Sequence, residues 1–146
     1  MKYLLDTNII IHYLRRSPLA ARIESTFQPL FSQNSPIISV VTEGELRSFA
    51  LQNNWGQQRL ESGIKFLHQF LIADINVKSI IERYAEIDAF SQGRHPALPL
   101  QISARNMGKN DLWIAATASV LDATLLTTDK DFDHLSGHFL KVESLN

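Results

Sequence analysis

Short apolar segments alternate with amphipathic segments along the chain, and this alternation limits the fold more than any other feature of the sequence. Five short, mainly apolar segments are expected to be strands, and they cover residues 2–5, 36–41, 72–76, 124–128 and 139–144. Segments with apolar residues at helical spacing separate them, at residues 7–16, 18–32, 42–52, 56–71, 77–92 and 110–123. Strands that alternate with helices build βαβ units around a parallel sheet. The sequence therefore predicts an α/β fold with a mainly parallel central sheet.

Length and composition narrow the class of protein. A chain of 146 residues without a linker-like segment suits one domain, residues 1–146, with a core of its own. The lack of cysteine excludes disulfides, thiolate nucleophiles and cysteine-type zinc sites, and it favours the cytoplasm. Polar residues interrupt the apolar start, as in a mature protein without a signal peptide. No run approaches the roughly 20 apolar residues that a membrane helix needs, so no membrane association is expected.

The charge of the chain does not by itself indicate a nucleic-acid partner. The formal net charge is −1 and the isoelectric point is near 6.5, whereas a typical nucleic-acid-binding domain has a value above about 9. Two bound divalent cations would make the net charge of the protein with its ions positive, because such ions can be the largest charges in a site. Basic side chains that could contact phosphates, or simply lie in solvent, are Arg15, Arg16, Arg94, Arg105 and Lys109.

Acidic residues stand where the expected strands end or where a following helix begins. In chain order they are Asp6 after the first strand, Glu43 and Glu45 after the second, Asp111 at the start of the helix before the fourth, and Asp129 after the fourth. The carboxyl ends of parallel strands meet at one edge of a sheet, and α/β proteins bind their ligands there. We therefore expect these carboxylates to gather at one rim.

Each acid also has a structural interpretation that remains open. Asp6 could cap the first helix, and Asp111 could interact with the dipole of the helix that it opens. Glu45 and Thr42 fit a capping box, and Asp129 fits an Asx turn in the segment TTDKDF. Four independent caps at one rim explain the pattern less well than a shared site does.

Clustered carboxylates repel one another and lose hydration, so some would take up protons unless a cation balanced them. Oxygen ligands without cysteine or clustered histidine favour Mg²⁺ or Mn²⁺ over zinc or copper. The sequence thus predicts a magnesium or manganese site, with one or two ions, whose ligands and catalytic residues are Asp6, Glu45, Asp111 and Asp129. It leaves open whether Glu43 or Asp131 joins them.

Three segments carry a family resemblance. LDTNIII, SVVTEGELRSF and NDLWIAATASVLDATLLTTDKDF resemble the signature regions of PIN-domain nucleases, and in particular of VapC ribonuclease toxins. The similarity covers residues 1 to about 133 in the order and spacing of the family. It places the four acids of the family at Asp6, Glu45, Asp111 and Asp129, and supporting polar residues at Thr7, Asn8 and Thr128. Departures, which concern substrate contacts rather than the acids, are the additional Glu43, the segment 47–49 and the long loop 93–109.

The resemblance implies a three-layer α/β/α sandwich and a metal-dependent endoribonuclease that cleaves RNA phosphodiester bonds. It further implies a cytoplasmic toxin of a toxin–antitoxin pair, with an antitoxin protein as partner and a homodimer as its own state. Two related alternatives are a housekeeping RNA-processing PIN nuclease without an antitoxin, and a non-catalytic PIN scaffold that binds RNA or protein. A phosphate-accepting receiver domain is a third, but it would need paired acids after the first strand, where this chain has Asp6 alone.

Overall fold

Five parallel strands form a single sheet in the computed structural model, which describes residues 1–146 except for the side chain of Ser32. The strands are β1 (Tyr3–Leu5), β2 (Pro36–Ser39), β3 (Leu71–Ala73), β4 (Thr124–Thr127) and β5 (Lys141–Ser144). Their order in the sheet is β3-β2-β1-β4-β5, and every neighbouring pair is parallel. The prediction of a mainly parallel α/β fold is confirmed, and β1 with its acidic end lies at the centre of the sheet.

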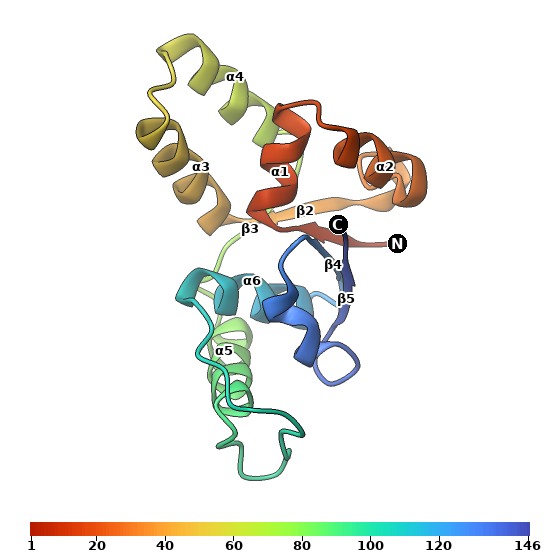
Figure 1. Ribbon diagram of the computed structural model, residues 1–146, viewed down its shortest axis with the longest axis vertical. Coiled ribbons are helices and arrows are strands. Elements are labelled where there is room, and N and C mark those ends of the chain that lie inside the picture. The colour runs from red at the N-terminus through yellow and green to blue at the C-terminus, as the bar shows by residue number, and fades with distance from the viewer.

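Helices cover both faces of the sheet (Figure 1). One face carries α1 (Thr7–Leu14), α2 (Pro18–Phe27), α3 (Val40–Gln52) and α4 (Gln57–Leu67). The other carries α5 (Lys78–Ser91), α6 (Lys109–Val120) and the short 3₁₀ helix η2 (Lys130–Leu135), while a second 3₁₀ turn, η1 (Ser32–Asn34), precedes β2. The three-layer α/β/α arrangement is therefore confirmed. No helix in the described part of the chain is long and apolar enough to cross a membrane.

The two cores follow from the alternation of side chains along each strand. In β1, Tyr3 and Leu5 pack among the residues of α1 to α4, whereas Leu4 packs against α5 and α6. Successive side chains of a strand point to opposite faces, so a strand covered on both sides must be apolar throughout. This requirement explains why the strands are continuous apolar runs, and why a charged residue can follow β1 only where the sheet ends.

Several helix boundaries differ from the sequence-based expectation, and the helix expected over residues 56–71 ends at Leu67, so that Leu71 begins β3. The helix expected to reach residue 32 ends at Phe27, because Gln28 adopts a left-handed conformation with φ of 50°. The helix expected to begin at Thr42 begins at Val40, and Ser39 is its N-cap, since the Ser39 hydroxyl accepts a hydrogen bond from the Val41 N–H. A helix that starts earlier turns Thr42 inward, where it is fully buried. The predicted capping box of Thr42 and Glu45 is therefore wrong.

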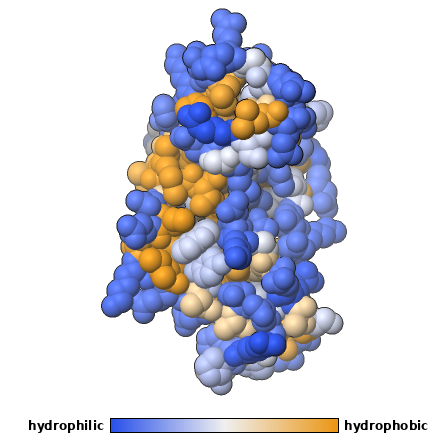
Figure 2. All heavy atoms as spheres, turned by 90° about the vertical axis from the view of Figure 1, so that its left-hand side faces the viewer, coloured by the Kyte–Doolittle hydropathy of each residue, from blue (hydrophilic) through white to orange (hydrophobic). Residues whose placement is uncertain are grey.

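An edge of the sheet exposes apolar side chains. β3 pairs only with β2 in the described structure, and Leu71 is 63% exposed there. Exposed apolar residues on β3 and at the adjacent starts of α3 and α5 are Val40, Leu71, Ile72, Val77 and Ile81. Figure 2 shows a broad apolar patch on this side of the molecule. We call these five residues the apolar edge.

Candidate active site

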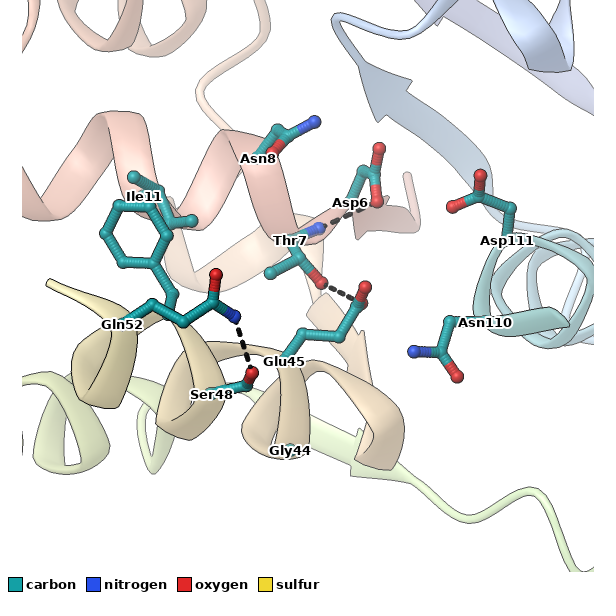
Figure 3. A pocket seen from close by; sticks show the side chains of 11 residues that line it. Asp6, Thr7, Asn8, Ile11, Gly44, Glu45, Ser48, Gln52, Asn110 and Asp111 are labelled. Atoms are coloured by element: carbon teal, nitrogen blue, oxygen red, sulfur yellow. Dashed lines mark hydrogen bonds between the residues drawn. The ribbon is translucent and has the colours of Figure 1, made fainter. Parts of the chain in front are cut away.

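A pocket of about 400 Å³ opens beyond the carboxyl end of β1, where α1, α3 and α6 meet. Its lining residues are Asp6, Thr7, Asn8, Ile11, Gly44, Glu45, Ser48, Phe49, Gln52, Asn110 and Asp111. Figure 3 shows the carboxylates of Asp6, Glu45 and Asp111 directed toward the same space from three different elements. Three of the four predicted acids thus meet in one pocket, at the edge of the sheet where the sequence placed them.

Asp6 is both a helix cap and part of the pocket. It is the N-cap of α1, and its Oδ1 accepts a hydrogen bond of 2.8 Å from the Thr7 N–H. Its Oδ2 accepts a second bond of 2.8 Å from the Thr127 hydroxyl, and the residue is 5% exposed. Burial raises the pKa of the Asp6 carboxyl from 3.8 to about 6, although both hydrogen bonds oppose the rise. The cap hypothesis and the site hypothesis are therefore compatible.

Glu45 is held by hydroxyl groups and not by a helix terminus. The Thr7 hydroxyl donates a hydrogen bond of 2.6 Å to Glu45 Oε1. The Thr42 and Thr7 hydroxyl oxygens are 3.0 Å apart, so Thr42 donates to Thr7 when Thr7 donates to Glu45. Figure 3 shows the bond from Thr7, with the Glu45 carboxylate facing the pocket. The sequence analysis did not identify Thr42 as a site residue. The only signal for it is a polar residue on the buried face of a helix.

Asp111 lies in the first turn of α6, whose N-cap is Gly108. Burial raises the pKa of the Asp111 carboxyl from 3.8 to about 7, and repulsion from Asp6, Asp129 and Glu45 adds to the effect. Its place near a helix N-terminus would by itself favour the charged form. The opposite direction of the shift means that lost hydration and neighbouring acids outweigh the helix dipole at this position.

Asp129 lies beside the pocket but is not among its lining residues. It caps η2 by accepting a 2.8 Å bond from the Asp131 N–H, as the Asx-turn interpretation predicted. The Asp129 N–H in turn donates to the Thr127 hydroxyl at 2.9 Å, and this hydroxyl also contacts Asp6. Thr127, and not Thr128, therefore links the two acids. Thr127 is the last residue of β4 and is fully buried. A polar residue at the end of a buried strand is the feature from which its role in the site could have been predicted.

The sequence left open whether Glu43 or Asp131 joins the site, and in the structure each of them lies near an arginine. Glu43 forms an ion pair with Arg47, with 3.0 Å between its Oε2 and the arginine Nε. Asp131 lies 3.8 Å from Arg105, between Oδ1 and Nη1, although its charge contributes to the raised pKa of Asp111. Neither residue lines the pocket.

The pocket has the donor chemistry of a hard-cation site without a preformed coordination sphere. Among the residues that the structure describes, no three acidic or histidine side chains converge closely enough to hold a metal ion. Oxygens of Asp6 and Glu45 are instead turned toward hydroxyl and N–H donors. The ionisable groups in the lining are nevertheless all carboxylates, and burial and mutual repulsion disfavour the charge on two of them. A divalent cation would relieve both effects, so the residues fit Mg²⁺ or Mn²⁺.

Known proteins resemble this chain over most of its length. The PIN domain family matches residues 3–137. Ribonuclease VapC1 from Haemophilus influenzae (strain R2866) is 31% identical over 139 residues, which cover 93% of this chain and 93% of that protein.

Solved structures share the fold over nearly their whole length. VapBC-1 from nontypeable Haemophilus influenzae matches with a TM-score of 0.70 and 26% identity over 99% of this chain and 98% of that chain. VapBC2 from Rickettsia felis, bound to a fragment of promoter DNA, has a TM-score of 0.74 and 23% identity with full coverage of both chains, which shows the fold alone. The resemblance in the three sequence segments thus extends to the entire fold, and this chain belongs to the PIN-domain family, among the VapC ribonucleases.

Proposed function

We propose that this chain, acting as a single PIN-like nuclease domain, hydrolyses RNA phosphodiester bonds at the pocket between α1, α3 and α6. The observation that carries the proposal is the convergence of Asp6, Glu45 and Asp111 from three elements on one pocket. If these carboxylates served only as helix caps, bringing them into one pocket would add repulsion between their charges and no compensating interaction. A site for cations and a phosphodiester does require such a group of acids.

In this proposal each carboxylate has its own role. Asp6 and Asp111 are the chief ligands, and Asp129 acts directly or through a water molecule. Glu45 is either a ligand or the group that orients the attacking water, and the Thr7 hydroxyl holds its carboxylate in place. A bound Mg²⁺ or Mn²⁺ ion would lower the pKa of a coordinated water and balance charge on the phosphodiester and on the leaving 3′ oxygen.

We also propose that the chain is the toxin of a toxin–antitoxin pair, with an antitoxin protein as its partner and the cytoplasm as its location. The support is the similarity to VapC1 and the shared fold with structures described as VapBC complexes. The absence of cysteine agrees with a reducing compartment.

A homodimer is the proposed state of the chain, with the apolar edge of Val40, Leu71, Ile72, Val77 and Ile81 as its interface. Soluble monomers rarely expose a large contiguous apolar patch, and an unpaired edge strand invites association. Substituting Ile72→Glu should turn a dimer of the wild type into a monomer in sedimentation experiments. A wild type that is monomeric at high concentration would remove this part of the proposal.

The nuclease proposal is tested with purified protein and a labelled RNA. Cleavage should require Mg²⁺ or Mn²⁺ and stop with EDTA, while Ca²⁺ should support little turnover because its looser geometry positions water and phosphate less well. Asp6→Asn should remove cleavage. Asp122→Asn is the matched control, because Asp122 is an exposed acid near the start of β4, at the opposite end of that strand from Asp129. Undiminished cleavage in excess EDTA would contradict the proposal.

A further inference from the structure

The pocket continues past the carboxylates along α1 and α3. The part beyond the acids is lined by Asn8, Ile11, Gly44, Ser48, Phe49 and Gln52, which we call the α1–α3 groove. Figure 3 shows Ile11, Ser48 and Gln52 on the far side of Glu45 from Asp111. The groove carries no ionisable side chain, so the cation site proposed above does not account for it.

The groove combines an aromatic ring with neutral hydrogen-bonding groups. Phe49 is half-buried and packs edge-on against Trp55, with ring centroids 5.9 Å apart. Gln52 Nε2 donates a 2.9 Å hydrogen bond to the Ser48 hydroxyl, which orients the amide, and Asn8 offers a second amide. An unpaired nucleobase is recognised by stacking on an aromatic or planar side chain and by hydrogen bonds to its edges.

A cationic side chain stands beside the same ring. The Arg15 guanidinium lies over Phe49, 5.2 Å from the ring centroid, and Arg15 is exposed. Arginine suits both stacking and phosphate binding. A base next to Phe49 would therefore bring the phosphate of its own backbone or of a neighbouring nucleotide close to the positive charge of Arg15.

A glycine forms part of the pocket lining on α3. Gly44 lies inside this helix, where glycine is less favourable than alanine. A Cβ at this position would meet nothing within 4 Å, so packing does not require glycine.

We propose that the α1–α3 groove binds the nucleotide next to the scissile phosphodiester, with its base beside Phe49 and a phosphate near Arg15. This inference rests on the proposed ribonuclease function. The entire pocket, at about 400 Å³, is large enough for a ligand of nucleotide size. The groove is also continuous with the carboxylates, where the reacting phosphodiester must lie. The enzyme should consequently prefer certain bases at one position beside the cut.

The test compares short RNAs that are randomised around the cleavage site with bis(p-nitrophenyl) phosphate, a phosphodiester without a base. Phe49→Leu should raise the KM for RNA at least tenfold and remove the base preference at one adjacent position, while Phe49→Tyr should retain both. The loss of activity in Phe49→Leu should be larger for RNA than for bis(p-nitrophenyl) phosphate, because only RNA presents a base to the ring. Leu51→Ala is the control on the same helix, because Leu51 is 79% exposed and lies outside the lining.

A second pair of variants does not depend on removing a packed ring. Gly44→Leu adds a large side chain to the pocket lining and should weaken RNA cleavage, whereas Gly44→Ala should not, and both should stabilise α3. An intact base preference and a KM within twofold of wild type in Phe49→Leu and Gly44→Leu would overturn the subsite. The same holds if these variants lose only binding of a co-expressed partner protein. A wild type that cleaves neither substrate with Mg²⁺ or Mn²⁺ would instead overturn the nuclease function, and the subsite with it.

Discussion

Replacing Asp6 with asparagine should stabilise the metal-free protein at neutral pH, although it removes a buried charged group that accepts two hydrogen bonds. The rise of the Asp6 pKa from 3.8 to about 6 corresponds to about 3 kcal/mol of folding free energy that the ionised form loses at pH 7.5. Asparagine caps a helix as well as aspartate does, so the bond from the Thr7 N–H remains. The bond from the Thr127 hydroxyl must reverse, at a cost of about 1 kcal/mol. The expected net gain is about 2 kcal/mol.

The sign of the pH dependence follows from the direction of the shift. The pKa of Asp6 is higher in the folded state than in the unfolded state, so the folded protein retains a proton that the unfolded chain releases. This contribution to stability is fully present below about pH 4 and is lost as the pH rises through about 6. Wild type and Asp6→Asn should therefore differ little at pH 4.5 and most at pH 7.5.

Urea and thermal unfolding followed by circular dichroism, in EDTA at pH 4.5, 6 and 7.5, measure the effect, with Asp122→Asn as the control. At pH 7.5 the melting temperature of Asp6→Asn should be about 4–8 °C higher than that of wild type. Adding Mg²⁺ or Mn²⁺ should stabilise the wild type and not the variant, because a ligand stabilises the state that binds it. A variant that is less stable than wild type at pH 7.5 in EDTA, or a difference independent of pH, would refute the reasoning.

Three further predictions concern activity. Glu45→Gln should leave stability nearly unchanged, since the Thr7 hydroxyl can donate to an amide oxygen. It should reduce cleavage at least tenfold, about 1.4 kcal/mol of barrier, and a loss in Glu43→Gln instead would mean that the wrong glutamate was chosen. At low Mg²⁺ concentration, kcat/KM should fall as the pH drops from 8 to 6, because protons compete with the cation at Asp111 and Asp6. A kcat/KM that does not change with pH would mean that protonation of these two acids does not control activity. In cells, induced wild type should halt growth and degrade RNA, while Asp6→Asn at equal abundance should be harmless. Growth curves and RNA integrity follow the effect, and blotting checks the protein level. Equal toxicity of the two proteins would mean that metal-dependent cleavage is not the cause.

The architecture could be predicted from the sequence because its determinants are local. The strands are buried on both faces, so they appear as apolar runs, and the helices between them show apolar residues at helical spacing. Strands linked through helices are parallel, and parallel strands bring their carboxyl ends to one edge. The sequence alone therefore assigns Asp6, Glu45 and Asp111 to a common rim, and in the structure they line one pocket.

The helix termini and the supports of the acids depended on tertiary structure. Ser39 and Thr42 are both good N-cap residues, and the choice between them depends on where β2 leaves the sheet, which no local pattern contains. The hydroxyl of Thr7 reaches Glu45 across 38 positions, and that of Thr127 reaches Asp6 across 121. The family resemblance pointed to Thr128 and not to Thr127, because the direction of a side chain at the end of a strand depends on the register of β4 with β1.

What the sequence by itself determined is the order of elements, the parallel sheet and the edge at which the acids collect. Only the folded chain decided how those acids are held, how strongly burial raises the pKa of Asp6 and Asp111, and that a groove toward Phe49 continues from them. The physical reason is one of range. Apolar periodicity acts over a few residues, whereas hydrogen bonds, repulsion and cavities depend on distances between side chains that only the packed structure brings together.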